Sequence, residues 1–419
     1  MYLIWGFPQL YSENTVSFED NTSELQNLIL NSPGKTINIS PKTYHINSTL
    51  YLPSDINIDF SGSTLVYHNS TNTPLIQNAD TEKGNSNIIL KNCIIKINSR
   101  SLFNRSYSLL RFEKLKNSVF SNIQVIGMGY RNYVVTGLWD FEDSSNCEII
   151  NCKLSDAFAE GLAIRNSYNF TVSGGEFHGC KNGSGIATIL GSGHVLRNVK
   201  SYDNAGSNFS INSTYTLIEN CISYNSTKFS GITLGHPKYI ASHSMVKDCK
   251  IYNIAGTGIY IDGASSNITI SNTNIENTKS EGIKAGGGSS NIKIIDNVIR
   301  RTLTGLYLNS SNSFVERNII DNNTNSGIVL NNSSGVHISR NTIKNNNISG
   351  ISFVQNSKDN IIEYNEIYND NKARTQKRGI YINKSSVRNI INNNYFNAHK
   401  FYDFNEHPNN SFKENSIKK

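Results

Sequence analysis

Residues 291–308 read NIKIIDNVIRRTLTGLYL, a run of short apolar stretches separated by Asn297 and Gly305. Stretches of the same form recur about every 23 residues from residue 85 onward. One aligned column contains Cys93, Ile123, Cys152, Gly175, Val199, Cys221, Cys249, Thr273, Asn297, Asn318, Asn341 and Asn365. A second column, about ten residues further along, contains Gly137, Gly161, Gly185, Asn208, Gly231, Gly258, Gly282, Gly305, Gly327, Gly350 and Gly379. The chain is therefore organised as a repeat.

A repeat of this length indicates a solenoid or a propeller. Apolar residues alternate in short runs, and the turns between them are rich in Asn, Gly and Ser, which is typical of strands rather than helices. Leucine-rich repeats fit less well, because Leu is sparse and the L-x-x-L-x-L pattern is absent. We therefore expect an all-β protein, a single-stranded parallel β-helix of about 13 coils.

Stacking explains the columns. In a parallel β-helix each residue lies about 4.8 Å from its counterpart one coil away, so about 13 coils would make a rod of roughly 60 Å. Identical side chains then form ladders, and Asn ladders add amide hydrogen bonds along the axis. Cys93, Cys152, Cys221 and Cys249 share the inward column, and we interpret them as small buried hydrophobic residues rather than disulfide partners or metal ligands.

The N-terminal part predicts a cap. Residues 20–31, DNTSELQNLILN, have a Thr/Ser helix start followed by Leu25, Leu28 and Leu30, which predicts a short amphipathic helix over the open end of the solenoid. We expect the entry and capping helix in residues 1–50, the β-helix in 51–398 and a C-terminal coil or cap in 399–419.

Composition and charge argue against several classes of function. The net charge of +7 is spread along the chain, so a nucleic-acid surface is poorly supported. The 6 cysteines have no zinc-like spacing, and no apolar stretch approaches the length of a membrane span. The opening MYLIWGF is too short for a signal peptide, so we expect a soluble protein with no membrane insertion and no signal at this terminus.

Two features resemble a known family. The stretch DNTSELQNLILNSPGKTINISPKTYHI (20–46) and the N-x-I…N-x-x-x-G-I coils after it resemble the pectate-lyase-like right-handed parallel β-helix superfamily, most of all the bacteriophage tailspike polysaccharide depolymerases. The resemblance implies a right-handed solenoid with carbohydrate polymer chemistry on its lateral face and, for tailspikes, a homotrimer. It assigns no residue: the G-H-G motif of polygalacturonases is incomplete at Gly193 and His194, and their Asp-Asp pair is absent.

Four long intervals between repeats predict loops that project from the rod, where functional residues tend to gather. The first two contain NSRSLFNRSYS (98–108) and GMGYRNYV (127–134), which includes Arg131. The third is GHPKYIASH (235–243), where His236 and Tyr239 could contact a substrate. The fourth follows Asn365 and contains DNKARTQKR (370–378).

Carboxylates interrupt one turn column, which contains Asp156, Gly179, Asp203, Asn225, Asn253, Asn277, Arg301, Asn322, Asn345 and Asn369. Asp156 and Asp203 are two coils apart, which is about 9.6 Å at the usual strand spacing. Inverting glycosidases hold their two carboxyl groups roughly 6.5–9.5 Å apart, so the spacing is compatible with that chemistry. Asp and Asn are also interchangeable turn residues, which leaves a purely structural role open.

Neighbouring residues complete the predicted site. His178 and Lys181 flank Gly179, and Glu160 and Arg165 lie on the adjoining strand. We expect the outward positions of successive strands to be Trp139, Ala163, Ala187, Ser210, Thr233 and Tyr260. Sugar rings could then lie on the small residues, against Trp139 or Tyr260.

Three functions remain open. The first is a depolymerase that hydrolyses an acidic bacterial surface glycan, with Asp156 and Asp203 as acid and base. His178 or Glu160 would assist, and Arg131, Arg165 and Lys181 would bind the acidic sugars. The second is a polysaccharide lyase or uronate epimerase, in which His178, His236 or Tyr239 abstracts a proton. The third is a glycan-binding or structural rod without catalysis.

These hypotheses share further expectations. No cofactor is expected for hydrolysis, whereas a lyase could hold Ca²⁺ through Asp and Glu. We expect a homotrimer located outside the cell or on a virion.

Overall fold

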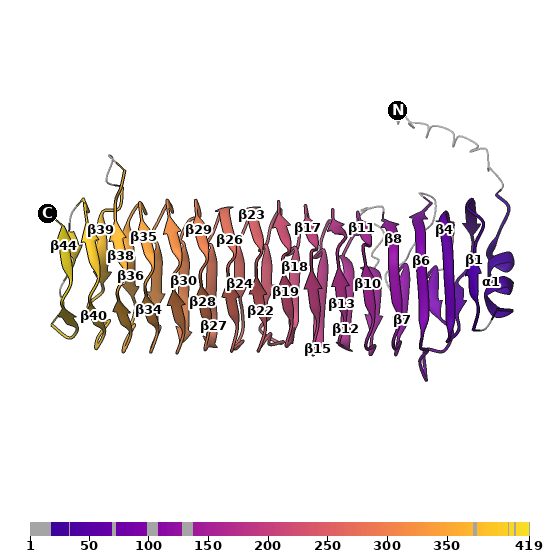
Figure 1. Ribbon diagram of the computed structural model, residues 1–419, viewed down its shortest axis with the longest axis horizontal. Coiled ribbons are helices and arrows are strands. Elements are labelled where there is room, and N and C mark those ends of the chain that lie inside the picture. The colour runs from indigo at the N-terminus through magenta and orange to yellow at the C-terminus, as the bar shows by residue number, and fades with distance from the viewer. Residues whose placement is uncertain are drawn as a thin grey trace, which may run out of the picture.

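The computed structural model describes residues 18–32, 34–68, 73–98, 108–127, 137–371, 375–400, 402–405 and 408–418. The chain winds into a long straight rod, with helix α1 (Thr22–Leu30) across its N-terminal end and the last coil at the other end (Figure 1). All strand pairings inside the two sheets are parallel and join each coil to the next, which confirms the expected all-β parallel β-helix.

One sheet forms a complete side of the rod, with one strand from each coil. Its 15 strands follow one another in chain order along the axis. They are β3 (Leu50–Leu52), β5 (Ile76–Asn78), β7 (Leu110–Glu113), β9 (Gly137–Glu142), β12 (Glu160–Tyr168), β15 (Ile186–Ser192), β18 (Phe209–Thr214), β21 (Ile232–Leu234), β24 (Ile259–Ile261), β27 (Ile283–Ser290), β30 (Leu306–Ser311), β33 (Ile328–Asn331), β36 (Ser349–Val354), β39 (Arg378–Ile382) and β42 (Tyr402–Phe404).

The other two sides form one 29-stranded sheet, because three long strands near the N-terminus bend across the corner between them. These are β4 (Ile56–Tyr67), β6 (Ile88–Ile97) and β8 (Val119–Ile126). The first of these sides adds β1 (Thr36–Asn38), β10 (Glu148–Ile150), β13 (Thr171–Ser173), β16 (Val195–Arg197), β19 (Leu217–Glu219), β22 (Met245–Lys247), β25 (Thr269–Ser271), β28 (Lys293–Ile295), β31 (Phe314–Glu316), β34 (His337–Ser339), β37 (Ile361–Glu363), β40 (Ile390–Asn392) and β43 (Ser411–Lys413). The second adds β2 (Thr43–Ile46), β11 (Lys153–Ser155), β14 (Glu176–His178), β17 (Lys200–Tyr202), β20 (Ile222–Tyr224), β23 (Lys250–Ile254), β26 (Asn274–Thr278), β29 (Val298–Arg300), β32 (Ile319–Asp321), β35 (Thr342–Lys344), β38 (Glu366–Tyr368), β41 (Tyr395–Asn397) and β44 (Ser416–Lys418).

In a typical coil, three left-handed residues form the turns. In one coil they are Asn291 (φ 54°), Asp296 (φ 58°) and Arg301 (φ 54°), and the same positions recur along the rod. Asn and Asp tolerate this conformation better than most residues, which explains why the turns are rich in them. The glycine column has a steric cause instead: a Cβ on Gly305 would lie 2.5 Å from the carbonyl oxygen of Gly327 in the next coil.

The core changes composition along the rod. Near the N-terminus, aromatic rings fill it, and Phe120 packs edge-on against Trp139 with ring centroids 5.1 Å apart. Further along, the inward column becomes a ladder of buried asparagines. Asn318 donates from Nδ2 to Oδ1 of Asn341, and Asn341 donates in the same way to Asn365, each over 2.9 Å. The expected stacking of identical side chains is therefore present.

The inward cysteines are also as expected. Cys93, Cys152, Cys221 and Cys249 are at most 2% exposed, and all are free. Burial raises the pKa of the Cys152 thiol to about 12, so this thiol stays protonated and unreactive near neutral pH.

Three details differ from the expectation. The complete side has 15 strands rather than about 13, because coils begin with β1 and continue through β44, beyond residues 51–398 at both ends. Fifteen coils correspond to a rod of about 70 Å. In α1, Leu25 and Ile29 are buried, whereas Leu28 and Leu30 are 41% and 54% exposed, because the helix rests on the solenoid along a narrower stripe than expected.

Removal of one ladder rung should destabilise the rod. In Asn341→Ala, the backbone N–H and Nδ2 of Asn318 lose their shared acceptor, and carbonyl oxygens of Val315 and Ser339 lose a donor. The two Asn318 donors are left without partners, and buried groups of this kind cost about 1–3 kcal/mol each, so we expect a loss of roughly 2–6 kcal/mol. Urea unfolding followed by circular dichroism measures it, with exposed Asn347→Ala as the control. Equal midpoints for both variants would contradict the ladder's role.

Candidate active site

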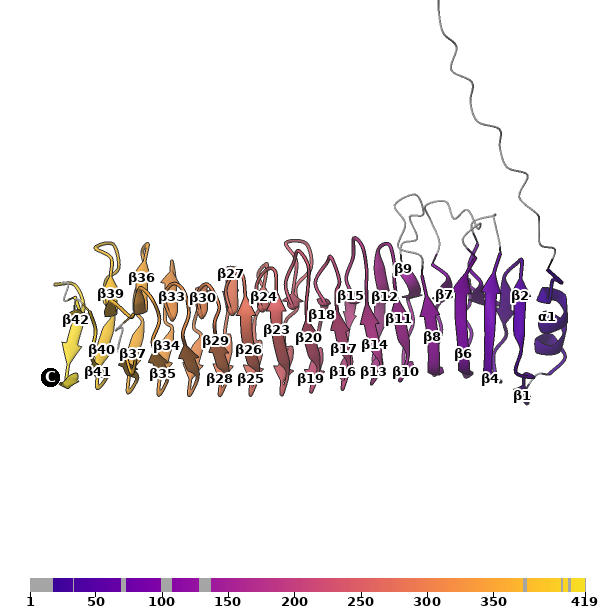
Figure 2. The same cartoon turned by 90° about the horizontal axis from the view of Figure 1, so that it is seen from above.

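The 15-stranded sheet runs along one side of the rod (Figure 2), and a cluster of charged residues lies on its outer surface. Its register differs by one residue from the alignment on glycine. Glu160 pairs with Gly137 and Leu162 pairs with Trp139, so Gly137 is not the counterpart of Gly161. The expectation that Trp139 faces a substrate is therefore wrong: its side chain is fully buried among Phe120 and Phe141.

The same shift places Asp140 on the outer surface, in register with Ala163 of β12 and Arg111 of β7. Arg165 Nε donates to Asp140 Oδ1 over 3.1 Å. Asp140 is only 6% exposed, and burial raises its pKa to about 6, although Arg165 and Arg111 act in the opposite direction. This carboxyl group can therefore hold or release a proton close to neutral pH.

Charged neighbours surround Asp140. Arg111 forms ion pairs with Glu113 (Nε to Oε1, 2.7 Å) and Glu142 (Nη2 to Oε2, 3.3 Å). These residues stand beside Asp140 and Arg165 on β7, β9 and β12. The group is a mixed cluster of carboxylates and guanidinium groups on adjacent strands.

Glu160 is a second carboxyl group with a raised pKa. It is partly buried at the first position of β12, and burial is the main cause of the shift, with its own backbone N–H and Arg165 opposing it. Glu160 lies three residues before Ala163 on β12, and Ala163 is the residue that pairs with Asp140 of β9. Counted along and across the strands, the two α-carbons are roughly 11 Å apart, close enough for both side chains to reach one substrate.

Asp156 and Asp203 lie at coil corners next to this sheet. Both have left-handed backbones, with φ of 58° and 55°, and Gly179 between them has φ of 75°. Lys181 Nζ approaches Asp156 Oδ1 to 3.8 Å. The left-handed backbone is a sufficient reason for Asp or Asn at these positions, and their catalytic role stays a prediction.

His178 belongs to a ladder of rings outside the second side of the rod. It stacks on Tyr202 with centroids 4.5 Å apart, and the stack continues through Tyr224 and Tyr252. His178 pairs in register with Ser155 of the previous coil, and Ser155 is the residue immediately before Asp156. His178 therefore flanks the corner column that contains Asp156 and Asp203 rather than Asp140.

The remaining expected contacts lie further along the rod. His236 and Tyr239 close a small turn after β21 through backbone hydrogen bonds in both directions, four strands beyond β9. Tyr260 faces outward on β24, and its hydroxyl donates to Asp262 Oδ1 over 3.0 Å. Arg131 and the surrounding segment 128–136 lie outside the described residues.

Sequence reasoning missed Asp140 because the glycine alignment decided the register. A signal was present: in Trp139-Asp140-Phe141-Glu142, large aromatic residues alternate with acidic ones. Strict alternation puts the rings inside and the acids outside. Aligning Gly137 with Gly161 shifted this strand by one residue, which exchanged the inward aromatic residues with the outward acidic ones.

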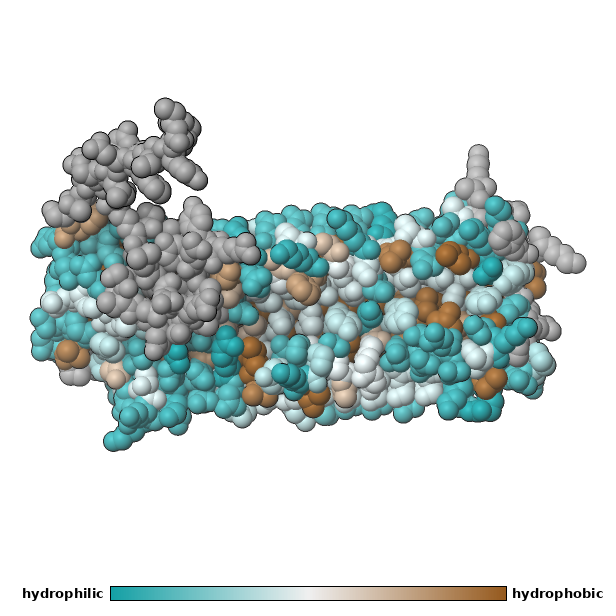
Figure 3. Space-filling model, turned by 180° about the vertical axis from the view of Figure 1, so that it is seen from behind, coloured by the Kyte–Doolittle hydropathy of each residue, from teal (hydrophilic) through white to brown (hydrophobic). Residues whose placement is uncertain are grey.

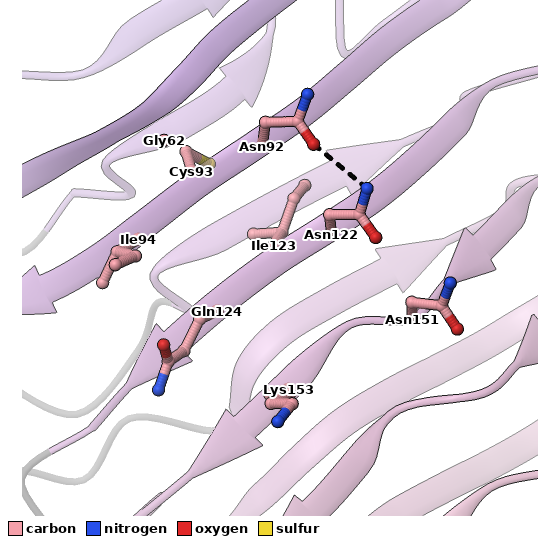
Figure 4. Close-up of a pocket in the computed structure, with 9 residues that line it drawn as sticks. All are labelled: Gly62, Asn92, Cys93, Ile94, Asn122, Ile123, Gln124, Asn151 and Lys153. Atoms are coloured by element: carbon pink, nitrogen blue, oxygen red, sulfur yellow. Dashed lines mark hydrogen bonds between the residues drawn. The ribbon is translucent and has the colours of Figure 1, made fainter. Parts of the chain in front are cut away.

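A separate hollow lies on the 29-stranded sheet (Figure 4). It measures about 380 Å³ and is lined by Gly62, Asn92, Cys93, Ile94, Asn122, Ile123, Gln124, Asn151 and Lys153. Asn122 Nδ2 donates to Asn92 Oδ1 over 3.0 Å along its wall. Apart from Lys153 its lining is uncharged, so it offers no pair of carboxyl groups for glycoside hydrolysis.

Comparison with family models gives two matches. Residues 242–419 match a family described as periplasmic copper-binding protein (NosD), and residues 114–238 match the right handed beta helix region. No curated protein sequence matches the chain. Within the part of the chain that the structure describes, no three His, Cys, Asp or Glu residues lie close enough to share a metal ion, so these donors do not fit a copper site. No helix among those residues is long and apolar enough to cross a membrane.

Solved structures share the fold at low identity. Pre-mature gene product 12 of bacteriophage phi29 is 9% identical, with a TM-score of 0.61 over 95% of this chain and 71% of that chain. The A-module of mannuronan C-5 epimerase AlgE4 from Azotobacter vinelandii is 12% identical, with a TM-score of 0.51 over 96% of each chain. PfbA, a surface adhesin of Streptococcus pneumoniae, is 15% identical, with a TM-score of 0.53 over 80% of this chain and 89% of that chain. At these identities the likeness shows the fold alone.

The raised pKa of Asp140 predicts a pH-dependent stability. Its ordinary value is 3.8 and its value in the fold is about 6, so the native state binds the proton more tightly than the unfolded chain does. The resulting stabilisation is present below about pH 4 and is lost as the pH rises through 6. We expect the unfolding free energy of wild type, relative to Asp140→Asn, to fall by about 2 kcal/mol between pH 4 and 7. Urea unfolding at several pH values measures it, and parallel pH curves for the two proteins would contradict it.

Proposed function

We propose that this chain, a member of the right-handed parallel β-helix superfamily, is an enzyme that cleaves an acidic polysaccharide on the outer surface of its 15-stranded sheet. One observation carries the proposal. Asp140 is a buried carboxyl group with a pKa of about 6, held by Arg165 on the surface of a rigid sheet. A carboxyl group of this kind is suited to general acid catalysis.

In the proposed hydrolysis, Asp140 donates its proton to the glycosidic oxygen as the bond to the anomeric carbon breaks. Glu160, as its carboxylate, accepts a proton from the attacking water. Arg165 Nε keeps Asp140 Oδ1 oriented. The separation of about 11 Å between the two α-carbons leaves side-chain length enough for carboxyl groups at the 6.5–9.5 Å spacing of inverting glycosidases.

Arg111 and Arg165 also suit an acidic sugar. Their guanidinium groups are partly exposed, and a uronate carboxylate can accept hydrogen bonds from such groups in pairs. Ala163 and Ala187 follow Asp140 in the outer column, and these small side chains are buried, at 0% and 3% exposed.

β-Elimination or epimerisation of a uronate is the second candidate. Two facts favour keeping it: one protein of the same fold is named as a mannuronan epimerase, and Arg165 could neutralise a uronate carboxylate beside a carboxyl group able to move protons.

By the same fold comparison, which includes a phage protein and a surface adhesin, we propose a location outside the cytoplasm, on a cell surface or virion. A homotrimer is proposed from the tailspike resemblance, and light scattering would test it.

Cleavage assays on variants test the proposal. We expect Asp140→Asn and Glu160→Gln to lower reducing-end release from a panel of bacterial capsules, alginate and pectate by 100-fold or more, because each removes an acid or base. Glu113→Gln is the matched control: it removes a nearby carboxylate that pairs only with Arg111 in the ion pairs described above. Full activity of Asp140→Asn, or cleavage of no polymer by the wild-type protein, would contradict the proposal.

The same assay separates the alternatives. Hydrolysis leaves no ultraviolet chromophore, whereas β-elimination produces an unsaturated uronate that absorbs, and epimerisation changes the uronate without new reducing ends. Asp156→Asn and Asp203→Asn should retain activity if those residues serve only as corners. If these two variants lose cleavage while Asp140→Asn keeps it, the active site lies instead at the corner column that contains Asp156 and Asp203.

A further inference from the structure

A trough lies on the same sheet, far from Asp140. It measures about 370 Å³ and is lined by Glu281, Leu303, Thr304, Tyr307, Asn325, Ser326, Val329, Ile348, Ser352, Val354, Arg378 and Tyr381. β30, where it begins, is the seventh strand after β9. That is about 34 Å at the usual spacing, so the trough is no part of the Asp140 cluster. The space-filling view from this side shows hydrophobic atoms among hydrophilic ones toward the C-terminal half (Figure 3).

Two tyrosines bound the trough along the axis. Tyr307, Val329, Ser352 and Tyr381 occupy one outer column on four successive strands, β30, β33, β36 and β39. The two tyrosines are thus three coils apart, about 14 Å, with two small residues between them. Asn331 Nδ2 donates to the Tyr307 hydroxyl over 2.6 Å, which fixes the first ring. The space between the rings suits two or three sugar units.

An arginine at the far end has an unused donor. Arg378 Nε is buried and has no hydrogen-bond partner among the described residues. The guanidinium lies 5.0 Å from the Tyr381 ring centroid and 5.6 Å from that of Tyr402. Ser349, the register partner of Arg378, also has a buried hydroxyl without a partner in the described part of the chain. Buried donors without partners are uncommon and costly, which points to a ligand that accepts from them.

A second cation lies at the other end. Lys284 Nζ is 5.4 Å from the Tyr260 ring centroid and 5.7 Å from that of Tyr307. Glu281, the carboxylate in the lining, already accepts hydrogen bonds from Ser280 and Thr257. Cations at both ends, aromatic rings and a hydroxyl-bearing floor are complementary to a sugar chain that carries carboxylates.

We propose that this trough is a second, non-catalytic binding site for an acidic oligosaccharide segment. A uronate carboxylate accepts from the guanidinium group of Arg378, sugar rings pack between Tyr307 and Tyr381, and their hydroxyls exchange hydrogen bonds with Ser326 and Ser352. The proposal shares its ligand class with the proposed function, but it does not depend on cleavage. It gives the rod an anchor that holds the polymer along the axis while another part of it reaches Asp140.

Titration calorimetry tests this site without cleavage. The probes are hexasaccharides of galacturonate, mannuronate and glucuronate, together with their carboxyl-reduced neutral counterparts, and the protein is the full chain carrying Asp140→Asn. In this background we expect Arg378→Gln to weaken binding of the best acidic probe about tenfold or more, because a charged hydrogen bond is lost. Tyr381→Ala should also weaken it, and the neutral counterparts should bind worse than the acidic ones.

Arg340→Gln is the matched control, because Arg340 also lies over a tyrosine ring, that of Tyr364, but at the corner between the two sides of the rod that form the 29-stranded sheet. It should leave the affinity unchanged, and thermal unfolding should show all variants folded. The proposal is overturned if no acidic probe binds, if neutral and acidic probes bind equally, or if Arg378→Gln and Tyr381→Ala both bind as tightly as their parent. If the wild-type protein cleaves no polymer but the Asp140→Asn protein still binds the acidic probe through Arg378 and Tyr381, the trough is supported and the proposed enzyme function is removed, so the two failures are distinguishable.

Discussion

In-register stacking of one coil on the next is the constraint on which the rest of the structure depends. Every coil must return to the same point after its corners, most of which are left-handed, so that each strand can hydrogen-bond with its counterpart. The interior enforces this register. An asparagine in the ladder, such as Asn341, bonds with the coil before it and the coil after it through side chain and backbone together. A slip by one residue would leave these buried groups without partners and would turn the core outward.

The same constraint organises the surface. Because register is kept over the whole length, outward residues form straight columns, and a change of residue type along a column marks a special place. In the outer column of the 15-stranded sheet, Arg111 and Asp140 give way to small residues, which then give way to Tyr260, Lys284 and Tyr307. A regular solenoid therefore presents two chemically different zones on one side, which suits a linear polymer that lies along the axis.

The fold and its interior followed from the sequence, because stacking repeats a residue type at a fixed interval. The Asn297 and Gly305 columns, the buried cysteines and the capping helix all left such repeats or local patterns. The site was harder to predict. Gly137 imitates the glycine column one residue out of step, and this local coincidence hid Asp140 and put Trp139 on the wrong side. The trough was missed because Tyr307 and Tyr381 are 74 residues apart in the sequence, and only the stacked coils bring them to the same trough.

In our proposal, an acidic glycan lies on the 15-stranded sheet with its reacting bond at Asp140. A crystal structure of Asp140→Asn soaked with the polymer fragment that wild type cleaves tests this most directly. We expect a sugar chain along the rod axis, with a glycosidic oxygen within hydrogen-bond distance of residue 140 and a sugar carboxylate on Arg165 or Arg111. A chain bound instead over the corner column of Asp156 and Asp203, or on the 29-stranded sheet, would contradict it.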